Sequence, residues 1–144
     1  MEGDIHRTIS FVIKRPGDPE ALLTVLRPPD DADLPDAWGL PAGRVRPGES
    51  WTDAVRRAGR DKLGVELDVG RELNRGSTHR AAYLLEMRLF EATITHGEPH
   101  VPQPHADVTQ YRAWRWARAD TLRPAAERGS LCCRLCLEVT PAGS

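Results

Sequence analysis

The stretch GRVRPGESWTDAVRRAGRDKLGV, residues 43–65, decides the fold. It opens with a glycine-rich turn and continues into Ser50–Leu63, where apolar residues recur at helical spacing. Ser50 can cap this helix, Asp53 stands where a reciprocal capping acid belongs, and Gly64 can end it. The stretch therefore predicts a loop, a helix and a second loop.

Strands are expected on both sides of this helix, because apolar and polar residues alternate there between turn-forming residues. The predicted strands cover residues 6–13, 21–26, 69–74, 81–95 and 110–117. Helical structure is expected again in residues 118–126 and 130–139, the second helix with Ser130 as its cap. The order predicts an α+β fold, with a mixed sheet between helices, and a length of 144 residues suits a single domain spanning 1–144.

Five positions of residues 43–65 fall in register with the signature of the Nudix family. These positions are Gly43, Glu49, Arg57, Gly64 and Val65. The preceding WGLPAG, residues 38–43, is similar to the lead-in of that family, as is Trp116 followed by residues 120–122. The chain thus resembles the Nudix hydrolases, which are MutT-like proteins, and the resemblance implies a Nudix fold.

The resemblance also implies a chemistry. In the family the glycine turn brings a backbone carbonyl, here that of Ala42, toward a divalent cation. The helix adds three carboxylates from one face, since residues three and four apart are neighbours. These ligands hold Mg²⁺ or Mn²⁺, which neutralises a diphosphate and activates a water molecule. The expected substrate is a nucleoside diphosphate linked to another group, such as ADP-ribose, a nucleotide sugar or a nucleoside triphosphate.

The three carboxylate positions are altered in this chain. Ala58 stands at the first and cannot bind a metal or take a proton, Asp61 keeps a charge on a shorter arm, and Lys62 reverses the charge. Gln110 stands near a further carboxylate of the family, with Asp107 and Glu98 as nearby substitutes. Residues 43–65 carry six basic and three acidic side chains, a net charge of +3, which favours phosphate over metal.

Glu49 and Arg57 match the ion pair that ties loop to helix in the family, and breaking a buried pair costs about 3–5 kcal/mol. The chain has kept what folds the motif and changed what binds metal. As catalytic residues we name Asp61, Glu49 and Lys62, and as tentative metal ligands Ala42 and Asp61. As substrate-binding residues we name Arg44, Arg57, Lys62, Trp38 and His79.

Several of these positions have two interpretations. Lys62 either replaces a cation beside the diphosphate or is a solvated lysine paired with Asp61 or Glu66. Asp61 either holds one metal ion or is a surface acid. A replacement base is sought among the histidines at 79, 96, 100 and 105, and nucleobase stacking is considered for Trp38 and Tyr83.

The composition excludes some classes of partner. A net charge of −1 gives no overall field that favours nucleic acid or an anionic membrane. We expect neither a signal peptide nor a membrane span, and hence a cytoplasmic protein, with a homodimer as the default assembly. The cysteines at 132, 133 and 136 are expected to be reduced and buried on one helix.

Two functions remain open from sequence. The chain is either a hydrolase with a metal-depleted site, or a catalytically impaired domain that binds a nucleotide or a protein partner without cleaving it. Loss of one transition-state electrostatic group can slow an enzyme by about 10²–10³.

Overall fold

The structure is a computed structural model that describes residues 4–105 and 107–140. Its strands are β1 (Asp4–Arg15), β2 (Asp18–Leu26), β3 (Trp38–Gly39), β4 (Ala42–Arg44), β5 (Glu66–His79), β6 (Tyr83–His96) and β7 (Ala113–Ala117). Its helices are α1 (Trp51–Ala58), the π-helical η1 (Gly59–Leu63), the 3₁₀-helical η2 (Ala119–Leu122), α2 (Arg123–Glu127) and α3 (Leu131–Val139).

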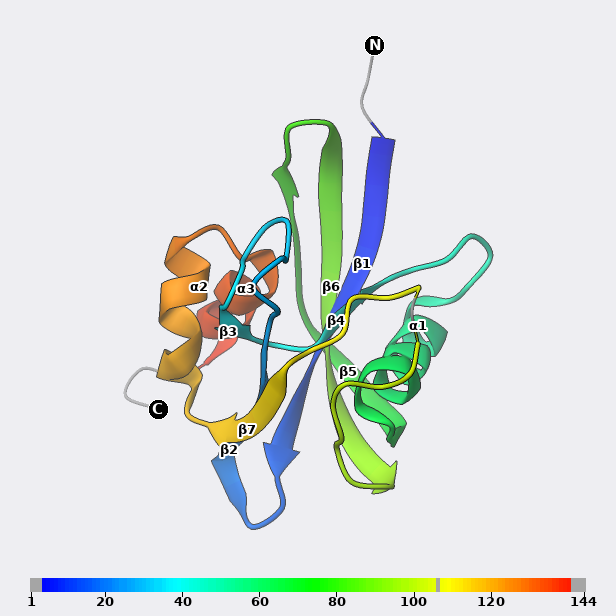
Figure 1. Cartoon of the computed structure of the whole chain (residues 1–144), viewed down its shortest axis with the longest axis vertical. Helices are drawn as coiled ribbons and strands as arrows, with labels where there is room; N and C mark the ends of the chain where they lie inside the picture. The colour runs from blue at the N-terminus through cyan, green and yellow to red at the C-terminus, as the bar shows by residue number, and fades with distance from the viewer. Residues whose placement is uncertain (1–3, 106, 141–144) are drawn as a thin grey trace.

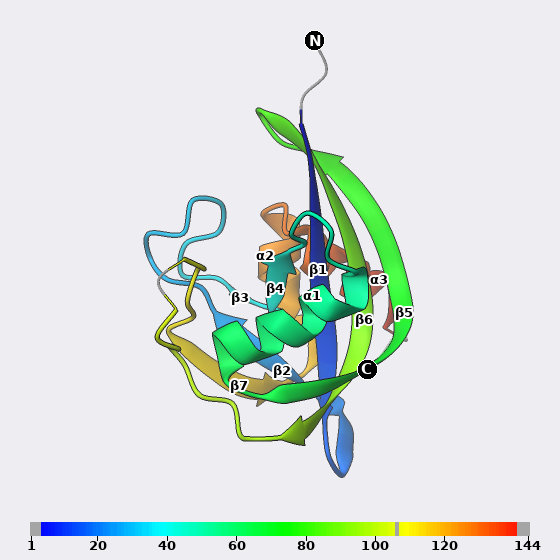
Figure 2. The same ribbon diagram turned by 90° about the vertical axis from the view of Figure 1, so that its right-hand side faces the viewer.

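The strands form one mixed sheet that lies between helices. Its seven strands have a main order of β3-β2-β1-β6-β5, with β4 paired to β1 and β7 paired to β2. Figures 1 and 2 show α1 over one face of the sheet and α2 with α3 over the other. The predicted α+β architecture is confirmed. Among the described residues, no helix is long and apolar enough to span a membrane.

Strand β1 occupies the centre and creates the site. It pairs in parallel with β6 from Asp4 to Ile13. Its opposite edge is shared, because β4 pairs with Thr8–Ser10 and β2 pairs only near Lys14 and Arg15. In the described part of the chain no strand pairs with that edge before Thr8. The first residues of β1 therefore border an opening in the molecule.

Alternate side chains of β1 pack into two hydrophobic cores, one on each face of the sheet. Ile9, Phe11 and Ile13 pack in the cluster that includes the buried face of α1, whereas Val12 packs in the cluster that includes α2 and α3. Period-two alternation of a strand between two faces produces this division. The helices are fixed on both sides, so the loops between them have a stable frame.

The predicted helix over 50–63 changes form at Gly59. Ser50 caps it as expected, because its Oγ accepts from the Asp53 amide at 3.1 Å, but the Asp53 carboxylate pairs with Arg56 at 2.9 Å. A Cβ at Gly59 would lie 2.6 Å from Leu67 Cδ1. The helix thus packs directly on β5 at a position where a Cβ would force the Leu67 side chain to shift, and its last turn is π-helical.

The late strand is shorter than predicted. It begins at Ala113 rather than at residue 110. The Gln110 side chain bonds the backbone of residues 61, 103 and 105, and the Tyr111 hydroxyl bonds Ala42, so these two residues belong to a loop that contacts the site. The alternation of apolar residues alone does not reveal that Gln110 and Tyr111 contact the site.

Candidate functional site

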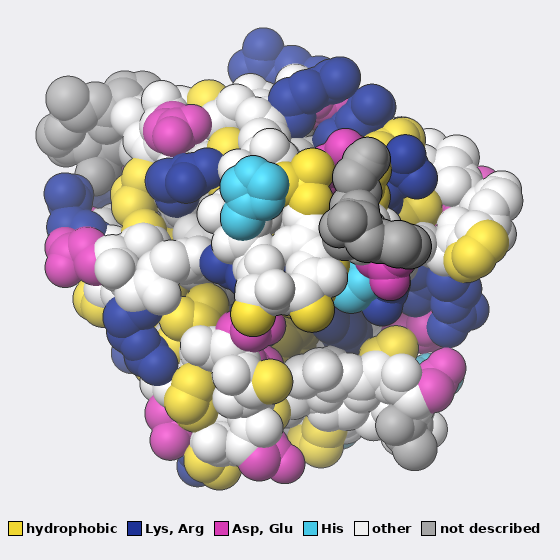
Figure 3. Space-filling model, turned by 90° about the horizontal axis from the view of Figure 1, so that it is seen from above, with side chains coloured by type: hydrophobic (Ala, Val, Ile, Leu, Met, Phe, Trp, Pro, Cys, Tyr) yellow, Lys and Arg dark blue, Asp and Glu magenta, His cyan; other side chains and the backbone are white. Residues whose placement is uncertain are grey.

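A cleft of about 1010 Å³ opens beside the N-terminal half of β1. Its walls come from the first residues of β1, from β4 and the loop that follows it, from η1, from residues 107–111 and from the start of α3. Viewed from above, the surface is hollowed near its middle, with Lys and Arg side chains around the hollow (Figure 3). The volume is at the upper end of the range of small-molecule sites.

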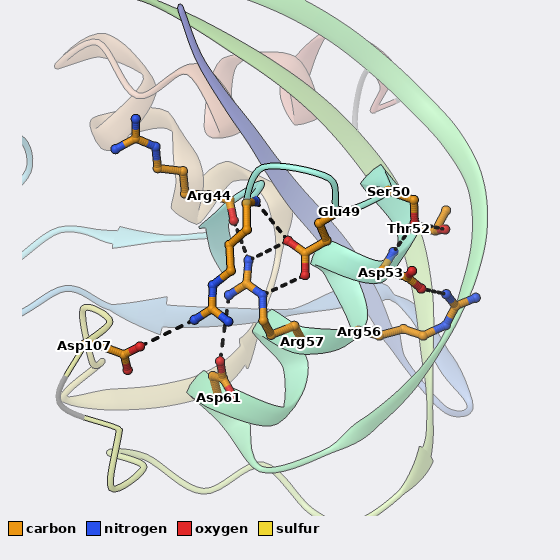
Figure 4. A network of polar contacts seen from close by, with 10 residues as sticks. Arg44, Glu49, Ser50, Thr52, Asp53, Arg56, Arg57, Asp61 and Asp107 are labelled. Atoms are coloured by element: carbon orange, nitrogen blue, oxygen red, sulfur yellow. Dashed lines mark hydrogen bonds and ion pairs between the residues drawn. The ribbon is translucent and has the colours of Figure 1, made fainter.

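Glu49 and Arg57 form one wall as a two-pronged ion pair. The Arg57 Nε lies 2.8 Å from Glu49 Oε2, and its Nη2 lies 3.0 Å from Oε1 (Figure 4). Arg57 also donates to the Arg44 carbonyl at 2.5 Å, and Glu49 accepts from the Arg46 amide at 3.0 Å. Hydrogen bonds from Arg57 lower the pKa of the Glu49 carboxyl, so this carboxylate is committed to structure.

The Lys62 ammonium reaches the carbonyl that the family resemblance assigns to metal. Its Nζ donates to the Ala42 oxygen at 2.5 Å and lies 5.2 Å from the centre of the Tyr111 ring. The Tyr111 hydroxyl accepts from the Ala42 amide at 2.9 Å and donates to the Ala42 oxygen at 3.2 Å. A fixed positive charge is therefore held at this carbonyl, with one side open to the cleft.

The Asp61 carboxylate lies near Arg57 and His105. Its oxygens lie 3.8 Å from Arg57 Nη1 and 3.8 Å from His105 Nε2. The Gln110 amide nitrogen donates to the Asp61 carbonyl at 3.0 Å, and its Oε1 accepts from the Gln103 amide at 2.8 Å. Gln110 thus connects residues 103 and 105 to the end of η1.

These side chains do not fit the divalent-cation site that the resemblance implies. Ala58 is 1% exposed, with its Cβ 3.2 Å from where a Cβ on Gly43 would stand, and it offers no oxygen. The Ala42 oxygen already receives Lys62 and Tyr111, while the Asp61 carboxylate faces other residues. Within residues 4–105 and 107–140, no three His, Cys, Asp or Glu side chains are grouped to hold a metal.

The cleft is lined by more positive than negative side chains. The basic ones are Arg7, Arg27, Arg44, Arg46, Arg57, Lys62 and Arg80, and the acidic ones are Asp33, Glu49 and Asp107. Two of the acids are already paired, because Glu49 binds Arg57 and Asp107 lies 3.4 Å from Arg46. The net potential favours an anion such as a phosphate.

The structure brings together only part of the set named from sequence. Ala42, Arg44, Glu49, Arg57 and Lys62 all line the cleft. Trp38 lines a separate hollow near α2, with Arg115 over its ring, and His79 is exposed at the end of β5. Neither lines the cleft, so a substrate-binding role for them remains a prediction without support from position. The same holds for a catalytic role of Asp61.

Sequence reasoning did not name Tyr111, Arg27 or Cys132 as site residues, and all three line the cleft. Tyr111 is 2% exposed and was read as part of a strand. Arg27 lies near Cys132 and pairs with Asp31 at 3.2 Å. The three cysteines are free and buried on α3, as expected, but a hydrogen bond from the neighbouring thiol, together with Arg27, lowers the pKa of Cys132. An arginine beside a buried thiol requires the tertiary fold and has no signal in sequence.

A loop–helix–loop that flanks a cleft on a mixed sheet defines a class of domain, and comparison with known proteins identifies the family. The model of the NUDIX domain family matches residues 4–131, so this chain belongs to the Nudix family. No curated protein matches it by sequence.

Solved structures share the fold at low identity. A NUDIX hydrolase from Nitrosomonas europaea superimposes with a TM-score of 0.73 at 19% identity, covering 94% of this chain and 87% of that one. A MutT protein from Methanosarcina mazei Go1 gives 0.70 at 16%, covering 89% and 91%. A MutT NUDIX hydrolase from Burkholderia pseudomallei gives 0.69 at 24%, covering 88% and 99%. These likenesses show the fold.

Proposed function

We propose that this Nudix domain binds the diphosphate of a nucleotide without a divalent cation, and does not carry out metal-dependent hydrolysis. One observation carries the proposal: the Lys62 ammonium lies 2.5 Å from the Ala42 oxygen, the carbonyl that the family resemblance assigns to metal. Hydrolysis in the family rests on a metal-activated water, and an ammonium cannot supply one.

The ammonium is suited to a phosphate. A lysine carries three donors, of which one serves Ala42, and Lys62 lines the cleft. The Tyr111 ring and the carbonyl fix the ammonium in place, which lowers the entropy lost when an anion binds. Arg44 lines the same cleft, and its planar donor group can bond a phosphate through two hydrogen bonds.

Isothermal titration calorimetry tests the proposal. Inorganic pyrophosphate and ADP-ribose are titrated into the protein in EDTA, and then in Mg²⁺. We expect binding in EDTA, changed less than about threefold by Mg²⁺, with no release of AMP from ADP-ribose over hours. Binding that requires Mg²⁺ and is followed by turnover would instead support the metal-dependent hydrolase.

Substitution of Lys62 by methionine is the decisive variant. One hydrogen bond to a charged group contributes about 1.5–3 kcal/mol, so pyrophosphate binding should weaken roughly ten- to hundredfold. The Ala42 oxygen keeps its bond from Tyr111, so the fold is not left with an unpaired carbonyl. The chain has one other lysine, Lys14, which is exposed, and Lys14→Met is the matched control that should bind normally. Equal affinity in both variants overturns the proposal.

Charge reversal gives a second test. Lys62→Glu replaces the ammonium at the Ala42 carbonyl with a carboxylate, next in sequence to the carboxylate of Asp61. We expect this variant to bind Mn²⁺ at least tenfold more tightly than the natural chain, measured by electron paramagnetic resonance of free Mn²⁺. Natural protein that binds Mn²⁺ as tightly as the variant contradicts the proposed role of Lys62.

A further inference from the structure

We infer that His6 and Tyr83 form a stacking platform for the nucleobase, at the end of the cleft away from Lys62. The two rings are 3.8 Å apart at their centres and tilted by 18°, and both line the cleft. Each side chain is only partly buried. An aromatic pair that faces a cleft instead of the core leaves a flat ring face available to a ligand. The inference rests on the proposed function, since it assumes that the ligand's phosphates lie at Lys62.

The sheet positions the two rings together. Tyr83 is the first residue of β6 and pairs with Asp4 of β1, two residues before His6. Side chains of a strand alternate between faces, so His6 lies on the same face as Ser10. The Arg80 amide donates to the Tyr83 carbonyl at 2.8 Å and closes the turn before β6. The platform therefore stands on backbone that the fold has already ordered.

The spacing along β1 between His6 and the residue that pairs with Ala42 suits a nucleotide. Ser10 pairs with Ala42, the residue that receives the Lys62 ammonium, and His6 precedes Ser10 by four positions on β1. At about 3.3 Å per residue, this separation along the strand is roughly 13 Å. An extended nucleoside diphosphate can place its base on the rings and its terminal phosphate near Lys62. Arg7, which also lines the cleft, lies between them along β1.

The surroundings of the platform favour a flat apolar group. Leu85 and Met87 follow Tyr83 on the same face of β6, and both line the cleft together with Leu131 at the start of α3. A nucleobase combines a broad π-face with polar edges, so it can cover this apolar floor while its edge remains hydrated. A sugar or a bare phosphate gains nothing from such a floor.

The test compares two ligands that share a diphosphate, of which only ADP carries a nucleoside. ADP and inorganic pyrophosphate are titrated by calorimetry into the natural chain and into Tyr83→Ala. Loss of one base–aromatic stack weakens ssDNA and RNA binding by about five- to a hundredfold, and we expect an effect of this size for ADP. Pyrophosphate binding should change less than twofold. Equal losses for both ligands, or none for either, overturn the platform.

Further variants separate stacking from folding. Tyr83→Phe keeps the ring and should bind ADP within about threefold of the natural chain. His6→Ala should weaken ADP selectively even if Tyr83→Ala does not fold. Lys14→Met, an exposed position on β1 outside the cleft, is the control and should have no effect. If pyrophosphate fails to bind the natural chain, the proposed function fails. If pyrophosphate binds and ADP binds no more tightly, only the platform fails.

Discussion

Arg57→Met should be the most destabilising surface-accessible change in residues 43–65. Methionine keeps the aliphatic packing but removes both bonds to Glu49 and the bond to the Arg44 carbonyl. The side chains of Arg57 and Glu49 are 13% and 16% exposed, so the pair is mostly shielded from water. Removal leaves a poorly solvated carboxylate whose remaining donor, among the described residues, is the Arg46 amide.

The size of the effect lies between two limits. Exposed ion pairs contribute about 0.2–1 kcal/mol, and breaking a buried pair costs about 3–5 kcal/mol. With two parallel bonds and a small remaining exposure, we expect a loss of about 2–3 kcal/mol in the free energy of unfolding. At roughly 2–4 °C per kcal/mol for a domain of this size, Tm should fall by about 4–12 °C. Urea denaturation measures the free energy of unfolding and a thermal melt measures Tm, both followed by circular dichroism.

A neighbouring pair supplies the control. Arg56 and Asp53 lie on the same helix and are joined at 2.9 Å, but their side chains are 40% and 64% exposed. Arg56→Met should therefore cost less than about 1 kcal/mol. If Arg56→Met and Arg57→Met destabilise equally, the energy resides in helix propensity or packing and the reasoning from the shielded pair is wrong.

The pH dependence of the same pair has a definite sign. The pKa of Glu49 is lowered in the folded chain from its ordinary 4.5, first by the Arg57 hydrogen bonds. Its contribution is present above pH 4.5 and is lost as the pH falls through the lower folded-state pKa. The natural chain should lose more stability than Arg57→Met over that acid interval, in parallel urea titrations. A constant difference between the two proteins would refute this assignment.

Three further predictions follow from packing, capping and charge. Gly59→Ala should destabilise the fold by about 1–3 kcal/mol, because its Cβ would lie 2.6 Å from Leu67, and urea denaturation measures the loss. Ser130→Ala should cost about 0.5–2 kcal/mol in the same assay, since the buried hydroxyl caps α3. Cys132, which lines the cleft beside Arg27, should be the thiol that iodoacetamide alkylates first near pH 7 and that pyrophosphate protects, as peptide mass spectrometry can show; equal labelling of all three thiols would contradict this.

The fold was predictable because its signals are local. The Ser50 cap and the Glu49–Arg57 pair lie within residues 43–65, and both have the geometry expected from sequence, whereas Gly43 lies in β4 and not in a turn. The alternation that marks β1 and β6 reflects burial on two faces, so the strands were also found. What failed was the form of the last helical turn, since Gly59 is explained only by Leu67 on a different element.

The site was predictable only in part, because several of its contacts join residues that are far apart in the sequence. The charge reversal at Lys62 is visible in sequence. The sequence allows this lysine either to be solvated and paired with an acid or to replace a cation in the site. The fold shows its ammonium at the Ala42 carbonyl. Tyr111 supports that position from a loop far along the chain. The stacked rings of His6 and Tyr83 come from strands that are 77 positions apart, where periodicity carries no information.

A fixed ammonium and a bound divalent cation differ in a way that separates binding from hydrolysis. Both stabilise a diphosphate by charge, so either can hold the ligand. A divalent cation also lowers the pKa of a water molecule that it coordinates and so creates a nucleophile. The ammonium of Lys62 cannot coordinate a water molecule in this way. The cation is covalently part of the chain, so chelators cannot remove it, and its single charge is weakened by salt. Under the proposed function, affinity should therefore fall steadily as NaCl rises and stay constant as EDTA rises. A metal-dependent site would respond to EDTA first.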